Sequence, residues 1–389
     1  MPILNRIAAY QPEMQGWRRD FHQHPELRFE EHRTAAQVAK LLQSWGIETH
    51  TGIATTGVVG VLRNGKSVRS IGLRADMDAL PMPEETGLPY ASVNPGKMHA
   101  CGHDGHTSML LGAAKYLAET KNFDGTVVFI FQPGEEGGAG AKLMMEEGLF
   151  TRFPCDAVYG LHNDPTLPLG EADIRDDVMA AAADRFYITV RGAGGHASRP
   201  HDCVDPIMVG SQIVGALQSI VARRVDPLES AVISVTQFHA GTAENVIADG
   251  AKLSGTVRTL IPGVQDLVEA TMRRVVEATA AAHDATAEII YRRGYPPTIN
   301  HAEQARRAAR AAETVLGDKV HRSMPPVMGA EDFAYFLLDR PGAYMKLGQA
   351  QGAKGSHGVH TGQYDFNDDL LPVGASWFAT LVEQEMSRG

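Results

Sequence analysis

Residues 99–106, which read H-A-C-G-H-D-G-H, gather metal-binding side chains in one short stretch. Thiolates, imidazoles and carboxylates are the groups that hold transition metals in proteins. No second ligand pair at the spacing of a zinc knuckle follows, so a metal bound here must take its other ligands from distant parts of the chain. Scattered ligands are typical of a catalytic site built from several loops. Taken alone, the stretch is equally compatible with a solvated polar loop around a buried Cys101.

Polar side chains also follow three apolar runs that predict buried strands. These runs cover residues 70–74, 127–131 and 156–161. Because α/β sheets keep their active sites at the carboxyl ends of the strands, the side chains that follow are candidates for one shared site. They are Asp76, Asp78, Glu135, Glu136 and His162, and a loop near the end of the chain adds His360.

The candidate ligands exceed what one metal ion needs. A mononuclear catalytic zinc usually has three protein ligands. A pair of metals that share some ligands accounts for the excess better. The candidates are Cys101, His103, Glu136, His162 and His360.

Two carboxylates beside these ligands suggest further roles. Glu135 precedes the ligand Glu136, and a free carboxylate next to a metal-bound water is suited to act as a general base. The alternative is an acidic helix start that the helix dipole stabilises. Asp78 can accept the free N–H of a ligand histidine. Its alternative role is to cap the turn before Pro81.

The elements that must position these residues predict a two-domain α/β protein. Strands alternate with helices over 30–182, including a helix expected over 106–119, and again after 295, which favours a mostly parallel sheet. Between them, the pattern changes to β-α-β-β-α-β, the ferredoxin-like arrangement. We therefore expect a metal-binding α/β domain formed by residues 1–182 and 295–389. The inserted α+β domain is expected to cover residues 183–294.

Three residues of the inserted domain are candidates for substrate binding. His196 lies in the glycine-rich loop 192–198 and can donate to a developing oxyanion, although an exposed loop histidine is the plainer interpretation. Asn245 lies between two predicted strands, where a turn asparagine is the plainer interpretation. Arg258 can clamp a substrate carboxylate, although most such arginines lie on the surface.

The composition limits the class of protein. The chain has 389 residues, of which 43% are hydrophobic and 21% charged, and this is typical of a globular protein of two domains. Its formal charge of -10 argues against nucleic acid as a partner. No apolar run predicts a membrane span, and charged residues near the start leave no signal core. Three cysteines form no disulfide framework, so we expect a cytoplasmic protein.

Taken together, the motifs resemble those of the M20 metallopeptidase family. They are similar to its amidohydrolase branch, which includes hippurate hydrolases, N-acyl-amino-acid amidohydrolases (aminoacylases) and auxin-conjugate (IAA-amino acid) hydrolases. The resemblance spans nearly the whole chain. In order, the motifs are W-R-R-D-F-H-Q-H-P-E-L (17–27), R-A-D-M-D-A-L-P (74–81), M-H-A-C-G-H-D-G-H-T (98–107), Q-P-G-E-E (132–136), G-L-H (160–162), G-G-H-A-S (194–198), G-A-E-D-F (329–333) and H-x-x-x-Y-D-F-N-D (360–368).

The resemblance implies a role for each candidate. Two divalent metal ions per subunit are expected, with manganese first and zinc, nickel or cobalt as alternatives. A homodimer, or a tetramer built from two such dimers, formed through the inserted domain is expected. The implied ligands are Cys101, His103, Glu136, His162 and His360, with Cys101 bridging; Glu135 is the implied base, Asp78 supports the ligands, and His196, Asn245 and Arg258 bind substrate.

One departure bears on the metals. Many M20 peptidases have H-x-D after the first strand, where this chain has Asp76-Met77-Asp78. The missing histidine leaves Cys101 and His103 to compensate, and a thiolate ligand changes the metal preference.

The leading hypothesis is a metal-dependent amidohydrolase that cleaves small-molecule N-acyl-amino acids into a carboxylate and a free amino acid. A dipeptidase or carboxypeptidase, or a deacylase of the N-acetyl- or N-succinyl-diaminopimelate type, is the alternative within enzymes. A metal-stabilised binding protein is the alternative from another class, and Glu135 argues against it. An alcohol or nucleobase hydrolase with a coincidental ligand set is a remote third possibility, because the full order of motifs opposes it.

Overall fold

The computed structural model describes residues 5–388 and divides them into two compact units. The main unit contains the residues up to Met179, Ile299–Pro325 and the residues from Asp332 onwards. The inserted unit contains Ala180–Thr298 and Pro326–Glu331. Two of the four connections between them are the short strands β7 (Val178–Ala180) and β14 (Thr298–Ile299), which pair with each other.

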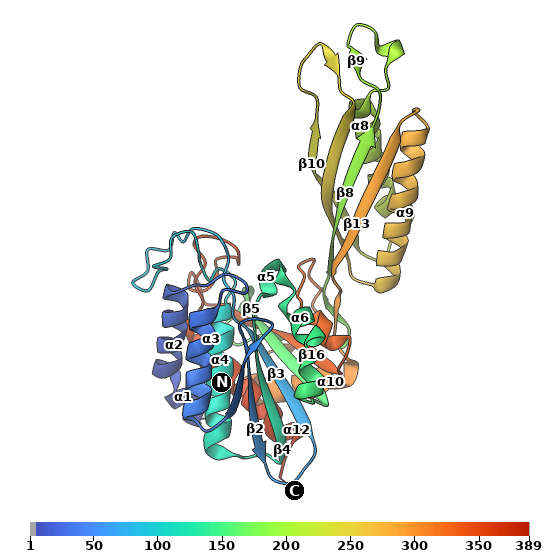
Figure 1. The fold of residues 1–389 in the computed structure, drawn as a ribbon. Helices are drawn as coiled ribbons and strands as arrows, with labels where there is room; N and C mark the ends of the chain where they lie inside the picture. Colours follow the sequence, from blue (N-terminus) through green and yellow to red (C-terminus); the bar gives the residue numbers. More distant parts are fainter. Residues whose placement is uncertain (1–4, 389) are drawn as a thin grey trace. The chain divides into compact units, whose positions relative to one another are not determined.

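An eight-stranded sheet forms the centre of the main unit (Figure 1). Its four central strands, β4, β3, β5 and β16, are parallel to one another, so the expectation of a mostly parallel sheet is confirmed. The outer strands add antiparallel pairs. In order across the sheet, the strands are β1 (Glu48–Ile53), β2 (Gly57–Asn64), β4 (Gly125–Gln132), β3 (Ser70–Asp76), β5 (Ala157–Pro168), β16 (Gly342–Ala350), β6 (Ala172–Asp173) and β15 (Val320–His321).

Helices cover both faces of this sheet, which explains why its central strands are continuous apolar runs. On β4, Val127 and Phe129 pack into one core, while Val128 and Ile130 pack into the core on the other face. The helices of the first core are α1 (Asn5–Ala9), α2 (Gln11–Gln23), α3 (His32–Ser44), α4 (His103–Thr120), α10 (Ala302–Leu316) and α12 (Leu371–Glu385). Those of the second core are α6 (Gly140–Glu146), α7 (Leu149–Arg152) and α11 (Ala334–Leu337), and the single turn α5 (Glu135–Gly138) precedes α6.

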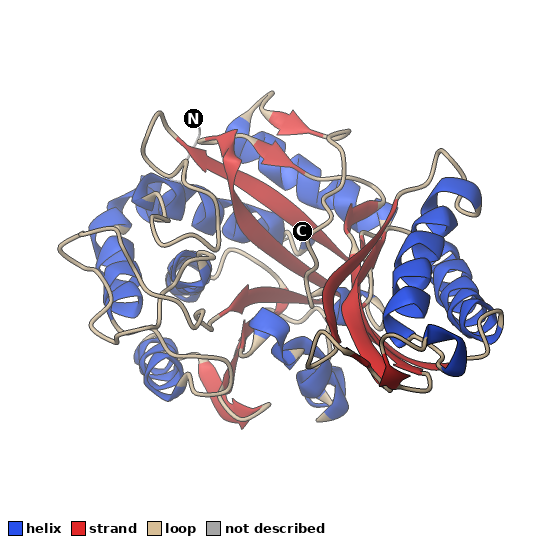
Figure 2. Cartoon of the chain, turned by 90° about the horizontal axis from the view of Figure 1, so that it is seen from above, coloured by secondary structure: helices blue, strands red, loops and turns tan. Residues whose placement is uncertain are grey.

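The inserted unit has the β-α-β-β-α-β order that the sequence predicts, so the ferredoxin-like expectation is confirmed. Its antiparallel sheet has the order β10-β12-β8-β13, and the two helices pack on one face of it (Figure 2). A second pair, β9 (Gly195–His196) and β11 (Val246–Ile247), lies outside this sheet. The elements are β8 (Ala182–Arg191), α8 (Pro206–Arg223), β10 (Ala231–Ala240), β12 (Gly250–Thr259), α9 (Pro262–Ala281) and β13 (Thr286–Tyr295).

The structure differs locally from the sequence expectations. Strand β1 was not expected, because its polar composition gives no strand signal. Helix α4 begins at His103, three residues before the expected start at His106. Among residues 5–388, no helix combines the length and apolar character that crossing a bilayer requires.

Candidate metal centre

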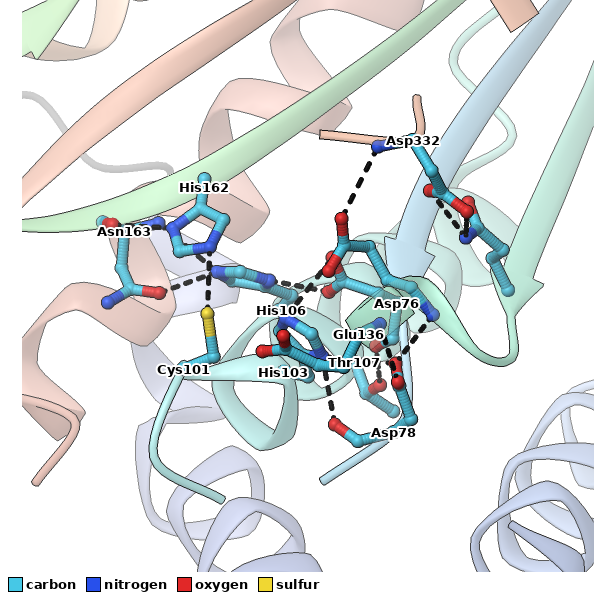
Figure 3. A network of polar contacts seen from close by, with 12 residues as sticks. Asp76, Asp78, Cys101, His103, His106, Thr107, Glu136, His162, Asn163 and Asp332 are labelled. Atoms are coloured by element: carbon cyan, nitrogen blue, oxygen red, sulfur yellow. Dashed lines mark hydrogen bonds and ion pairs between the residues drawn. The ribbon is translucent and has the colours of Figure 1, made fainter. Parts of the chain in front are cut away.

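The predicted ligands converge at the carboxyl edge of the parallel strands (Figure 3). Cys101, His103 and His162 form one group of possible ligands, and Cys101, Glu136 and His360 form another. Within each group, one donor atom per residue lies within 4.8 Å of the others. Cys101 belongs to both groups.

The loop before α4 brings Cys101 and His103 together. Gly102 has a φ of 108°, a conformation that favours glycine. A Cβ at this position would lie 2.2 Å from Asn163 Oδ1 and 2.6 Å from the Tyr364 hydroxyl, so only glycine fits. Because α4 starts at the next residue, His103 and His106 share one face of its first turn.

Hydrogen bonds fix the tautomers of two predicted ligands. His103 Nδ1 lies 2.8 Å from the Asp78 backbone carbonyl, and His162 Nδ1 lies 2.7 Å from the Asn163 carbonyl. A carbonyl only accepts, so both Nδ1 atoms carry a proton, and the neutral form of each imidazole has its lone pair on Nε2. His162 Nε2 lies 3.3 Å from Cys101 Sγ, and His103 Nε2 is buried without a hydrogen-bond partner.

The surroundings give the ligand groups contrasting proton affinities. Burial raises the pKa of the Cys101 thiol well above its usual value, and Glu136 raises it further. Burial lowers the pKa of His162 to about 3, and this keeps the imidazole in the neutral form that binds metals. A cation is therefore needed to hold Cys101 as a thiolate at neutral pH.

A tight turn carries Glu135 and Glu136 towards the same candidate ligand, His103. Gly134 and Gly137 both have positive φ, which lets the backbone reverse on either side of the pair. The Asp78 carboxylate accepts both backbone N–H groups, from Glu135 at 3.0 Å and from Glu136 at 2.8 Å. We expected Asp78 to accept from a ligand histidine. His103 Nδ1 lies 3.3 Å from this carboxylate, but it bonds the Asp78 backbone carbonyl.

His360 reaches the second group from a loop near the end of the chain. It adopts a positive φ of 62°, and its backbone N–H donates to the Ala100 carbonyl at 2.7 Å. This bond ties the loop to the segment that carries Cys101. His360 Nε2 lies 3.1 Å from Glu136 Oε1, and about half of the His360 side chain is exposed.

The structure adds His106, and beside it lies Asp76, a strand-end candidate to which the sequence reasoning gave no role. His106 Nδ1 lies 2.6 Å from Asp76 Oδ1, and both side chains are buried. Burial alone would raise the pKa of Asp76, but Arg74, His103 and His106 hold it well below its usual range. The signal was present, because Asp76 ends β3 and His106 belongs to the His99–His106 stretch.

The three candidates of the inserted unit lie in two places. His196 and Asn245 are exposed and adjacent, since β9 pairs with β11 and Ala197 N–H donates to the Asn245 carbonyl. Arg258 lies at the other end of β12, where it faces Ala183. The eight residue steps from Gly250 to Arg258 correspond to about 27 Å of strand. Within one inserted unit, Arg258 therefore lies far from His196 and Asn245.

Three features of the described residues suit the binding of a pair of metal ions. The donors are sulfur, imidazole and carboxylate, two histidines carry their proton on Nδ1 so that Nε2 can bind a metal, and His103 Nε2 is buried without a hydrogen-bond partner. All three are properties of a transition-metal site.

Comparison with known proteins identifies the family. Residues 72–384 match the peptidase family M20/M25/M40. The chain is 42% identical to a hippurate hydrolase of Campylobacter jejuni over 98% of its length and 99% of the relative. It is 38% identical to an N-acetylcysteine deacetylase of Bacillus subtilis, and this match covers 96% of this chain and 97% of the relative. A dinuclear metal binding peptidase of the M20 family from Bacillus subtilis has a TM-score of 0.85 at 35% identity, and the match covers 97% of this chain and 99% of that one. The chain belongs to the M20 family of hydrolases.

Proposed function

We propose that this protein hydrolyses the amide bond of N-acyl-amino acids and that it does so with two divalent metal ions. The observation that carries the proposal is the pair of ligand groups that share Cys101, with Glu135 beside them. The similarity to a hippurate hydrolase and an N-acetylcysteine deacetylase supports this substrate class. Two bound cations would polarise the amide carbonyl and lower the pKa of a water molecule.

Glu135 is the proposed general base. Glu135 is buried. One of its carboxylate oxygens, one nitrogen of His103 and one carboxylate oxygen of Glu136 lie within 4.8 Å of one another. Asp78 holds the backbone of residues 135 and 136, so Glu136 can serve as a ligand while Glu135 stays available for proton transfer. Glu135 would take a proton from the attacking water and deliver it to the leaving amine.

We propose that the inserted unit supplies the groups that recognise the substrate. Ser198 N–H donates to His196 Nδ1 at 3.1 Å, which places the imidazole proton on Nε2, where it can stabilise an oxyanion. Asn245 is proposed to hold the acyl end and Arg258 the carboxylate end. Burial lowers the pKa of Arg258, but an arginine stays charged at neutral pH.

A homodimer is the proposed assembly. An N-acyl-amino acid is much shorter than the roughly 27 Å that separates the Arg258 and His196 ends of the sheet, so both can serve one substrate only if two copies take part. Strand β10 is an edge without charged residues, whereas the other edge, β13, carries Glu288, Arg292 and Arg293. Uncharged edges pair readily with a second chain.

Metal identity and compartment are also proposals. We expect manganese, with zinc, nickel and cobalt as alternatives that a site with sulfur, nitrogen and oxygen donors accepts. Three free cysteines, one of them a proposed ligand, support a reducing compartment such as the cytoplasm. Loading the metal-free protein with each ion and comparing turnover identifies the metal.

The substitution Glu135→Gln tests the proposed base. We expect kcat for hippurate to fall by about 10²- to 10⁴-fold while the metal content stays unchanged. The neighbouring substitution Glu136→Gln is the contrast, because it should lose metal together with activity. Near-normal turnover by metal-loaded Glu135→Gln would show that another group is the base.

A further inference from the structure

A buried polar network lies directly behind Glu135 and consists of Arg74, Gln132 and Asp332. All three side chains are fully buried, and they come from β3, the end of β4 and the segment before α11. The proposed chemistry uses none of them. Burying two charged groups and an amide is costly unless each is paired, so the network needs a reason to be there.

The Asp332 carboxylate joins the two ends of the turn that carries Glu135. Gln132 Nε2 donates to Asp332 Oδ1 at 2.8 Å and lies 2.9 Å from Oδ2. The backbone N–H of Ala141 donates to Oδ2 at 2.9 Å. Gln132 and Ala141 lie on either side of residues 133–140. One carboxylate therefore fixes both the entry and the exit of the turn.

The same residue also contacts the Glu135 side chain. The backbone N–H of Asp332 donates to Glu135 Oε1 at 3.3 Å. Arg74 completes the arrangement, because Nη2 lies 3.1 Å from Asp332 Oδ1, Nε donates to Gln132 Oε1 at 2.8 Å and Nη1 lies 2.8 Å from Asp76. Asp332 is thus anchored by a guanidinium that also reaches the edge of the metal centre.

From these contacts, we propose that Asp332 is a positioning residue for the reaction. Its carboxylate fixes the turn over residues 133–140, and its backbone N–H holds the Glu135 carboxylate in the orientation that proton transfer requires. This inference rests on the proposed function, since it takes Glu135 as the base. Asp332 itself does not touch substrate. Its loss should therefore lower kcat and leave KM nearly unchanged.

The test is the variant Asp332→Asn, loaded with metal and assayed with hippurate. The amide keeps the shape but replaces one acceptor oxygen with a donor that faces Gln132 or Ala141. We expect kcat to fall about 10- to 100-fold, with KM within about twofold and metal content unchanged. The double variant Gln132→Glu with Asp332→Asn returns a carboxylate to the network. Its kcat should be at least about fivefold higher than that of Asp332→Asn alone.

Asp184 provides a matched control in the inserted unit. It is also a fully buried aspartate, and it accepts from Gln265 Nε2, the Tyr291 hydroxyl and the Gly294 backbone N–H. Asp184→Asn should lower thermal stability to a similar extent while leaving kcat at saturating substrate unchanged. If both variants lower kcat equally, general destabilisation explains the effect, and the inference is wrong.

The remaining outcomes separate this inference from the proposed function. Normal kcat in folded, metal-loaded Asp332→Asn overturns the inference, whereas normal kcat in Glu135→Gln overturns the proposed base. If Asp332→Asn does not fold, Gln132→Leu removes one donor and leaves the charges balanced. This variant is expected to lower kcat about threefold, and an unchanged kcat would overturn the inference.

Discussion

Single hydrogen bonds decide which atoms of the site can bind metal. The carbonyls of Asp78 and Asn163 fix the protons of His103 and His162 on Nδ1, so that Nε2 is the atom that each neutral imidazole offers to the group it forms with Cys101. Cys101 lies in both ligand groups. Cys101, His103, His162 and Asp78 were all predictable from the sequence, because the H-A-C-G-H-D-G-H stretch and the strand-end positions mark them.

Other residues of the site could not be predicted in the same way. Arg74 contacts Asp332 across a separation of 258 residues, and no local pattern signals such a pair. Buried polar side chains of this kind depend on tertiary packing, which decides whether an arginine on an apolar strand is paired or exposed. The tautomers depend on backbone carbonyls, which every sequence contains.

Glu31 gives a prediction about pH at the residue scale. Its buried carboxylate accepts from Gly134 N–H at 2.9 Å and from the Thr56 hydroxyl, and Asp78 lies nearby. Burial raises its pKa from 4.5 to about 7. The folded state then holds the proton more tightly than the unfolded state does, so stability falls as the pH rises from 4.5 towards 7.

The variant Glu31→Gln should lose this contribution. Between pH 4.5 and 7, the free energy of unfolding of the wild type should fall relative to that of the variant by about 2–3 kcal/mol. Urea denaturation at several pH values measures both. Parallel stability profiles would contradict the prediction.

At the scale of elements, two tight turns bring the ligands to the ends of the parallel strands. One precedes α4 and the other carries Glu135, and both depend on glycines with positive φ. The sequence indicated turns at both places, and the helices and strands that flank them were predicted. The start of α4 was placed three residues too late, because a polar first turn carries no apolar periodicity.

The substitution Gly102→Ala tests the first turn. Its Cβ would meet Asn163 and Tyr364, so the backbone between Cys101 and His103 must move. We expect loss of metal and at least about a tenfold loss of kcat/KM, because misplaced ligands bind more weakly. Metal analysis after dialysis provides the measurement.

Gly87→Ala is the matched control. Gly87 also has a positive φ, of 67°, but a Cβ there meets nothing within 4 Å. Backbone strain should lower the free energy of unfolding of the Gly87→Ala variant by only about 1–2 kcal/mol, and the variant should keep its metal. If both variants keep metal equally well, close packing at Gly102 does not position the ligands.

At the scale of the whole molecule, the order of elements predicted an α/β unit interrupted by a ferredoxin-like one, and both are present. The chain also contributes residues 326–331 to the inserted unit, a return that no composition change marks. The spacing of apolar residues does not predict how copies of the protein assemble. It rests on surface features such as the uncharged edge strand β10.

The substitution Val232→Lys tests the dimer. Val232 lies on β10 with 37% of its surface exposed, and a lysine on an edge strand opposes pairing with a second chain. We expect the wild type to sediment as a dimer and the variant to shift towards monomer. Ile290→Lys on the opposite edge strand, β13, should remain dimeric. Dimers that persist equally in both variants would exclude the β10 interface.

The most direct test of the account is hydrolysis of hippurate and N-acetyl-amino acids by the purified protein before and after treatment with a chelator. The account predicts about two metal ions per chain and release of the free amino acid. It also predicts loss of turnover on chelation and recovery when manganese or zinc is restored. A fully metal-loaded protein that cleaves no N-acyl-amino acid, or turnover that survives complete removal of metal, would contradict it.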